Sequence, residues 1–385
     1  MVTFRWRWSA FALLLVVAIV VFCMAVQPVR AHLQALAVLR EAAGQPVPLI
    51  ADEVTAAVTK RDLTYNIGAG SRGQQIRARL YEPADGENSP AMVIFHGVHH
   101  LGIDEPRLMS FAAAMASCGI RVLTPELPDI KEYRVREESV KTIGGSVKWF
   151  AAESGSPVGV MGLSFSGGLA LVAAADPQYH RDFKFVMAVG SQSSMARVTE
   201  YYRTGSDLRP DGTVELLPAH EYGPLVLEYE YLEDFVPADD LAPVRAVLRA
   251  HLYEDKEAEA QASLVLNEVQ KREALELMDV TSAATHERIT AVGLKHAGEM
   301  SGLSPAGRLE GLDTPVYLLH GQADNIIPAA ETLWMAEELP REHLKAVLVS
   351  PALSHLNLDG AGPGTMDNWR LLHFFAGVMQ AAEAR

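Results

Sequence analysis

Short apolar runs alternate with longer amphipathic segments along most of the chain. Two stretches of alternating polarity, 58–68 and 74–83, flank a glycine-rich turn and predict a hairpin. Continuous apolar runs are typical of strands buried on both faces, and they occupy 91–97, 120–128, 158–163, 182–191, 314–321 and 344–350. Helical spacing of apolar residues recurs between these runs, at 105–119, 137–154, 329–339 and 366–384.

This alternation stops at about residue 192 and resumes after about residue 311. The intervening block is rich in Glu, Leu and Ala, has almost no strand signal, and shows helical spacing at 241–255 and 259–280. Alternating strands and helices predict an α/β fold with a doubly wound, mostly parallel sheet. We therefore expect a core formed by 61–191 and 312–385, interrupted by a helical lid subdomain at 192–311.

The N-terminus has the pattern of a targeting segment. Arg5 and Arg7 precede an uncharged, apolar run over 9–26, which exceeds the usual signal-peptide core of about 7–15 residues and reaches the length of a candidate membrane span. Residues 1–31 therefore form either a cleaved signal peptide, with Ala31 at the cut, or an uncleaved membrane anchor, which we favour. Either reading places the rest of the chain outside the cytoplasm, in the cell envelope or secreted.

A helical stalk followed by a linker is expected over 32–60. The chain has 385 residues, of which 49% are hydrophobic and 21% charged, a globular balance. Its formal net charge of −15 argues against nucleic acid as a partner. The two cysteines, Cys23 and Cys118, give neither a disulfide framework nor zinc-type spacing. No sequence feature indicates an oligomeric state.

A candidate nucleophile lies between a predicted strand and a predicted helix. In Gly162-Leu163-Ser164-Phe165-Ser166, small residues on both sides of Ser164 permit a sharp strand-to-helix turn that would expose its hydroxyl. Ser166 also has small flanking residues. We favour Ser164 because it directly follows the apolar strand and leaves Gly167 at the close strand–helix contact.

A serine nucleophile needs a base and a carboxylate that orients the base. Asp324 follows one predicted strand and His355 follows the next. A solvated turn and an incidental loop histidine are the alternative interpretations. The chain order Ser, Asp, His is nevertheless the order expected of one hydrolase architecture.

Oxyanion donors are expected from two loops. The strand at 91–95 leads into His96-Gly97, whose loop can turn the Val98 amide toward the nucleophile, and the Phe165 amide would be the second donor. We interpret His96 as a structural residue that holds this loop. His99 and His100 are loop residues that could touch substrate. Their spacing lacks carboxylate partners for zinc, so we expect neither a metal nor a cofactor.

The segments "FHGVHH", "GLSFSGG", "HGQADNIIP" and "LSHLNL" together resemble the α/β-hydrolases, more loosely their dienelactone-hydrolase and serine-peptidase-like branches. The resemblance implies Ser164, Asp324 and His355 as the triad, Val98 and Phe165 as oxyanion donors, and a lid over the site. Two features depart from the family pattern. A serine stands at 166 where glycine is usual, and the lid matches none that we can name.

The expected activity is hydrolysis of a carboxylic ester or thioester through an acyl-enzyme, on a small-molecule substrate. Two alternatives remain: a peptidase or acyltransferase with the same triad, and a catalytically inactive, membrane-tethered binding module.

Overall fold

The computed structural model describes residues 26–68, 73–84, 86, 89–353 and 364–384. Eight strands form one sheet in the order β1-β2-β4-β3-β5-β6-β9-β10. Strand β2 is antiparallel to both of its neighbours, and the strands from β4 to β10 are parallel. The strands are β1 (Val58–Ile67), β2 (Gln74–Pro83), β3 (Ala91–Phe95), β4 (Arg121–Pro125), β5 (Val158–Leu163), β6 (Phe183–Val189), β9 (Val316–Gly321) and β10 (Leu344–Ser350).

Burial follows the sequence pattern. Strands β3 and β9 are buried at every position, as their continuous apolar runs require in the middle of a parallel sheet. Strand β1 is mostly exposed and pairs with β2 as the predicted hairpin, and β10 closes the other edge with a half-exposed pattern. The α/β class and the mostly parallel sheet expected from the sequence are confirmed.

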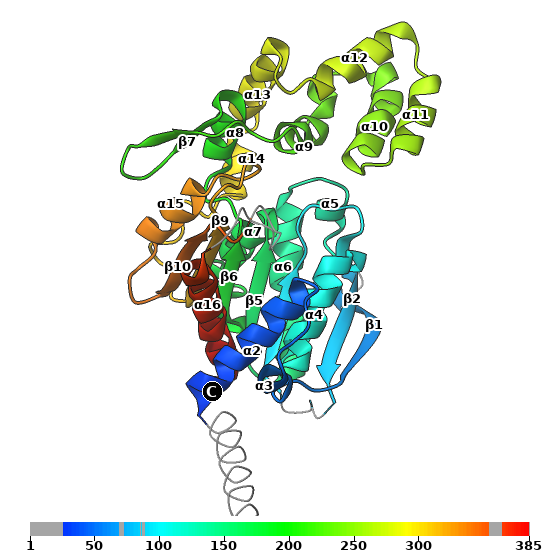
Figure 1. Cartoon of the computed structure of the whole chain (residues 1–385). Coiled ribbons are helices and arrows are strands. Elements are labelled where there is room, and N and C mark those ends of the chain that lie inside the picture. The colour runs from blue at the N-terminus through cyan, green and yellow to red at the C-terminus, as the bar shows by residue number, and fades with distance from the viewer. Residues whose placement is uncertain (1–25, 69–72, 85, 87–88, 354–363, 385) are drawn as a thin grey trace, which may run out of the picture.

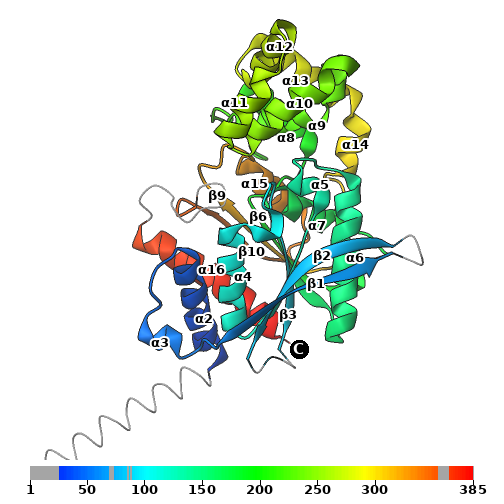
Figure 2. The same cartoon turned by 90° about the vertical axis from the view of Figure 1, so that its right-hand side faces the viewer.

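Helices cover both faces of the sheet (Figure 2). One face packs against α2 (Gln27–Ala42), α4 (Pro106–Ser117) and α16 (Thr365–Glu383). The other packs against α6 (Glu137–Ser154), α7 (Phe165–Ala174) and α15 (Ala330–Glu338). Short helical turns complete the core at α3 (Leu49–Asp52), η3 (Gly102–Asp104), α5 (Pro128–Lys131) and η4 (His180–Asp182).

The helical part of the segment predicted as a stalk lies against the domain. Helix α2 begins at Gln27, packs on α4 and α16, and buries Ala31, Ala35 and Val38 completely. Most of the apolar run at 9–26 lies outside the described residues. Within the described part of the chain, no helix combines the length and apolarity needed to cross a membrane.

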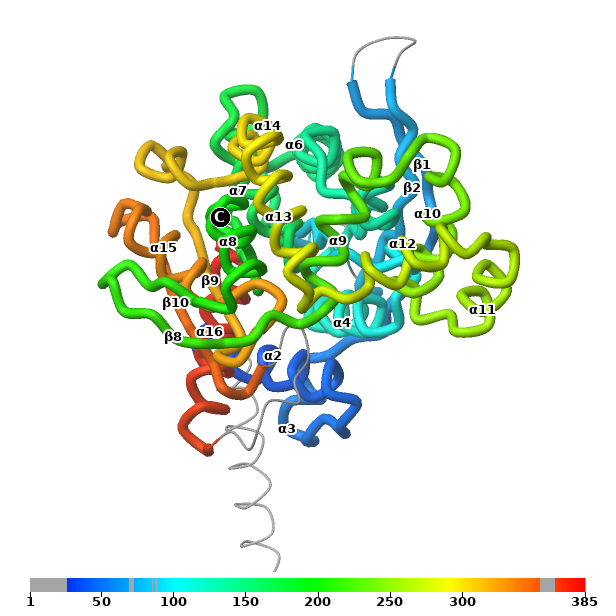
Figure 3. Tube along the Cα trace, turned by 90° about the horizontal axis from the view of Figure 1, so that it is seen from above, coloured from blue at the N-terminus to red at the C-terminus, as the bar shows by residue number. Residues whose placement is uncertain are grey.

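Residues 192–311 lie over one end of the sheet (Figures 1 and 3). We call this segment the insertion. Its helices are α8 (Met195–Thr204), α9 (Tyr222–Glu230), η5 (Leu232–Asp234), α10 (Ala238–Leu252), α11 (Lys256–Leu264), α12 (Glu268–Met278), α13 (Ala283–Lys295) and α14 (Ala297–Gly302). The insertion has an apolar core of its own around α9, α10 and α12, which also includes Tyr133.

Two details of the insertion differ from the expectation. A short hairpin, β7 (Ser206–Leu208) and β8 (Val214–Leu216), occurs where almost no strand signal was read. The helix expected over 259–280 is broken, because the Asn267 side chain accepts hydrogen bonds from Val269 N and Gln270 N and so caps a new helix, α12.

Candidate active site

Ser164 occupies a sharp turn between β5 and α7. It is buried, with φ of 56° and ψ of −135°, a conformation that non-glycine residues rarely adopt. Such strain costs about 1–3 kcal/mol and is found mostly at functional sites. The turn closes because a Cβ at Gly162 would lie 2.4 Å from the Gly167 Cα, so only glycine fits at Gly162.

The two serines of the turn have different surroundings. The fully buried Ser166 hydroxyl donates a hydrogen bond of 2.6 Å to the carbonyl of His96. Ser164 instead occupies the N-cap position, immediately before the first residue of α7. The Phe165 N–H therefore belongs to a helix N-terminus, where negative charge is stabilised.

His96 holds the loop that follows β3. Its Nε2 accepts a hydrogen bond from Leu127 N at 3.0 Å, and its Nδ1 lies 2.8 Å from the carbonyl of Gly97. These partners require a neutral ring with the proton on Nδ1. Burial lowers the pKa of His96 to about 4, which agrees with a neutral, structural side chain.

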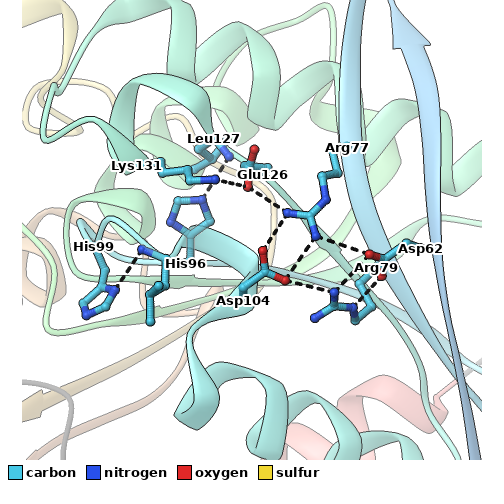
Figure 4. A network of polar contacts seen from close by, with 10 residues as sticks. Asp62, Arg77, Arg79, His96, His99, Asp104, Glu126, Leu127 and Lys131 are labelled. Carbon is cyan, nitrogen blue, oxygen red and sulfur yellow. Dashed lines mark hydrogen bonds and ion pairs between the residues drawn. The ribbon is translucent and has the colours of Figure 1, made fainter.

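A charged network supports the same loop on the side of the β1–β2 hairpin (Figure 4). Asp104, in η3, pairs with Arg77 at 2.7 Å and with Arg79 at 2.9 Å, and both arginines extend from β2. Asp62 of β1 pairs with Arg79 at 2.5 Å. Hydrogen bonding from Arg77 is the main cause that lowers the pKa of Asp104. The network ties the end of the loop to the hairpin.

The insertion contacts the loop directly. The Tyr222 hydroxyl, on α9, donates to the carbonyl of Val98 at 2.9 Å. Burial raises the pKa of Tyr222 well above its usual value, so the hydroxyl stays protonated and keeps donating. The rings of His99, His100 and Tyr253 stack in sequence with centroid separations of 4.6 Å. The loop that carries the candidate oxyanion donor is therefore held from both sides.

Asp324 lies buried in the turn after β9. Its Oδ1 accepts hydrogen bonds from Ile326 N at 2.9 Å and Ile327 N at 3.0 Å, and its Oδ2 lies 3.4 Å from His320 Nε2. His320 was not among the predicted site residues. It bonds to the Ile327 carbonyl at 2.8 Å and to the Thr332 hydroxyl at 2.7 Å. The sequence feature that could have indicated His320 is its position as a histidine at the end of a buried apolar run.

The structure thus places most of the predicted site residues at the carboxyl ends of the neighbouring central strands β3 and β5. The hydrogen bond from the Ser166 hydroxyl to the His96 carbonyl joins the turn that holds Ser164 and Phe165 to the loop after β3. That loop contains Gly97, Val98 and His99.

Asp324 follows β9, which is separated from β5 by β6, and it lies close enough to influence the pKa values of Tyr201 and Tyr202. His355 lies outside the described residues, and its role stays a prediction. Strand β10, which precedes it, ends at Ser350. Among the residues described, no group of three His, Cys, Asp or Glu side chains could hold a metal ion.

A cavity of about 20 Å³ lies between the core and the insertion. Phe165 and Val135 line it from the core. The insertion contributes Met195, Tyr202, Gly223, Val226, Leu227, Glu230, Tyr231 and Leu303. Phe165, the residue after Ser164 in the chain, is thus part of the cavity wall.

The strand order, the single antiparallel strand β2 among the inner strands, and a serine on a strained turn between a central strand and a helix define the α/β-hydrolase fold. The chain has this fold.

No protein-family model and no curated protein matches the sequence. Among solved structures, the chain is similar to a membrane phospholipase A described as a bacterial virulence factor, at 14% identity over 99% of both chains with a TM-score of 0.43. It is similar to a putative lipase of Acinetobacter baumannii AYE, at 15% identity over 78% of this chain and 87% of that one, with a TM-score of 0.41.

Similarity also extends to an acylaminoacyl peptidase of Pyrococcus horikoshii, at 13% identity and a TM-score of 0.39. There the alignment covers 77% of this chain but only 38% of the peptidase. This chain therefore spans well under half of the peptidase's length.

Proposed function

We propose that the protein is a serine hydrolase that cleaves a carboxylic ester or thioester. The observation that carries the proposal is the strained, left-handed conformation of Ser164 at the N-terminus of α7. A protein gains nothing in stability from such a backbone, whereas a nucleophile gains a fixed position at the tip of the turn and a helix N-terminus beside it.

In the proposed reaction, Ser164 Oγ attacks the carbonyl carbon of the ester while His355 takes the hydroxyl proton. Asp324 orients the His355 ring and stabilises its charged form. The amides of Phe165 and Val98 donate to the developing oxyanion. His355 then gives the proton to the departing alcohol or thiol, leaving an acyl group on Ser164. A water molecule, deprotonated by His355, then attacks the acyl carbon, and His355 returns the proton to Ser164 Oγ as the acid leaves.

A fluorophosphonate probe tests this assignment. Labelling of the wild type that persists in Ser166→Ala and disappears in folded Ser164→Ala supports the proposal. Absence of labelling in the folded wild type would favour an inactive binding module instead.

A panel of esters beside peptide amides and acyl acceptors then separates an esterase from a peptidase or acyltransferase. Clear amide cleavage with negligible hydrolysis of every ester would contradict the esterase assignment.

We also propose that the chain stays anchored to a membrane by residues 9–26, with the catalytic domain outside the cytoplasm. Helix α2 starts at Gln27, immediately after that run, and Arg30 pairs with Glu383 of α16. A cut after the fully buried Ala31 would remove this pair and the first turn of α2. Folding interactions on the N-terminal side of the candidate cleavage site support an uncleaved anchor.

The start of α2 lies at the end of the molecule opposite the insertion (Figure 1). The site would then face away from the bilayer and take substrate from the aqueous side. Intact mass and alkaline extraction of the envelope fraction test the anchor. Retention in the membrane pellet with the N-terminal segment present is expected, and a released chain that begins at His32 would contradict it.

A further inference from the structure

Two of the residues that line the cavity beside Phe165 each carry a buried polar atom that has no hydrogen-bond partner. These atoms are Glu230 Oε2 and the Tyr202 hydroxyl. Both side chains are more than nine-tenths buried, with 7% and 5% of their surface exposed. Leaving a buried polar group unsatisfied is costly, and a bound water or a polar group of a ligand in the pocket would supply the missing partner.

The carboxylate is held so that one oxygen remains available. Arg136, at the start of α6 in the core, donates to Glu230 Oε1 at 2.7 Å, and this ion pair fixes the carboxylate across the boundary between core and insertion. Oε2 is left without a partner. The Tyr202 ring, on α8, lies directly against Gly223 of α9, where an added Cβ would come within 2.5 Å of it. Both groups therefore have restricted positions.

We propose that this cavity binds the acyl part of the substrate and that Glu230 and Tyr202 recognise a hydrogen-bond donor, an amine or a hydroxyl, on that acyl part. The inference rests on the proposed hydrolase function and specifies its substrate class. A carboxylate oxygen accepts hydrogen bonds and cannot donate when ionised, so a donor or cation satisfies it. The surrounding side chains, such as Val135 and Leu227, accommodate only apolar atoms next to that donor.

The electrostatics agree with this assignment. Burial raises the pKa of Glu230 to about 7, despite the opposing effect of Arg136. A donor or an ammonium group in the cavity would favour the charged form and complete the coordination of the carboxylate. The cavity volume of about 20 Å³, close to that of one water-sized group, indicates that it takes one small substituent of the acyl part rather than a long chain.

The chain offers a matched control two residues away on the same helix. Glu228 is also fully buried, has a pKa raised to about 7, and pairs with one arginine, Arg288, at 2.5 Å. Its Oε2 is likewise unpartnered, but it does not line the cavity. Glu228→Gln therefore repeats the loss of a buried carboxylate charge without altering the proposed subsite.

The test uses two sets of nitrophenyl esters. Within each set, the esters differ only in one group of similar size, which is a methyl, a hydroxyl or an amino group. One set is isobutyrate, lactate and alaninate, and the other is isovalerate, β-hydroxybutyrate and β-aminobutyrate. The full-length wild type, Glu230→Gln, Tyr202→Phe and Glu228→Gln are compared by kcat/KM. Each rate is divided by the same ester's spontaneous hydrolysis rate, because amino and hydroxyl substituents activate esters on their own.

We expect the wild type to prefer the amino or hydroxyl ester over its methyl counterpart by at least about tenfold in one set, as a charge-assisted hydrogen bond allows. Glu230→Gln should reduce an amine preference about tenfold, Tyr202→Phe should weaken a preference for either donor, and Glu228→Gln should leave it unchanged. Comparison of the amino and hydroxyl esters identifies the donor.

Absence of a preference for the amino or hydroxyl ester in both sets, or equal effects of Glu230→Gln and Glu228→Gln, overturns the inference while the hydrolase assignment stands. Absence of ester hydrolysis and of fluorophosphonate labelling in the folded wild type would instead overturn the proposed function itself. If Glu230→Gln does not fold by circular dichroism, Tyr202→Phe decides the outcome alone.

Discussion

Replacement of Ser166 by alanine separates the two serines of the turn. Its fully buried hydroxyl donates a hydrogen bond of 2.6 Å to the His96 carbonyl and so joins α7 to the loop that carries Val98. Loss of a buried hydrogen bond that leaves one partner in place costs about 1–3 kcal/mol. We expect Ser166→Ala to lower the free energy of unfolding by about 2 kcal/mol, within that range.

Urea unfolding measures this change as a lower midpoint with an unchanged slope. Fluorophosphonate labelling should persist but slow, by less than the roughly 10²–10³-fold that loss of a whole oxyanion donor costs. Ser193→Ala is the matched control, because Ser193 is equally buried and its hydroxyl has no partner. Equal stabilities of the two variants would refute the structural role of Ser166. Complete loss of labelling in folded Ser166→Ala would refute Ser164 as the nucleophile.

Three further changes test the frame of the site. Gly162→Ala would place a Cβ 2.4 Å from the backbone of α7 and should cost about 1–3 kcal/mol in urea unfolding, whereas Gly298→Ala, with no atom within 4 Å, should be near neutral. The pKa of the His96 ring is about 4 in the folded state and about 6.5 in the unfolded state. The free energy of unfolding of the wild type should therefore fall by up to about 3 kcal/mol relative to that of His96→Gln as the pH is lowered from 6.5 to 4, as measured by denaturation across that range. Tyr222→Phe removes the hydrogen bond to the Val98 carbonyl and should lower kcat more than it raises KM in steady-state assays, and an unchanged kcat would contradict this role.

The sheet could be predicted because its strands carry a local signal. An apolar run such as Ala91–Phe95 is buried at every position, so composition alone identified it. The hairpin of β7 and β8 gave no such signal. Its strands have three residues each, and Val214 and Leu216 are exposed, so no alternation between a buried and a solvated face exists to be read.

Contacts between residues far apart in the sequence could not be predicted either, because they also leave no local sequence signal. The buried residues Ala31, Ala35 and Val38 follow helical spacing and predict a helix, but nothing local states that the apolar face packs on α4 and α16. His320 and Glu230 were missed similarly, since their importance depends on partners from other elements of the chain, namely the Thr332 hydroxyl and Arg136.

The position of Ser164 could be predicted because the turn that holds it depends on residues next to it in the sequence. Small residues at 162 and 167 permit the close strand–helix contact, and the strained φ follows from that contact. Asp324 could be predicted for a related reason, because it lies in the turn after a recognisable strand. His355 follows the next strand by the same logic and remains a prediction.

The arrangement separates the proposed chemistry from the proposed selectivity. The candidate reacting groups follow β3, β5 and β9, where the sheet fixes their backbones. The groups proposed to recognise the acyl part are Tyr202 and Glu230, which belong to α8 and α9 of the insertion. The two parts are nevertheless in contact, because the insertion also hydrogen-bonds to the Val98 carbonyl through Tyr222 and to the Asn325 carbonyl, next to Asp324, through Tyr201 at 3.2 Å. In the proposed reaction, a change in how the insertion packs would therefore alter oxyanion stabilisation as well as substrate choice.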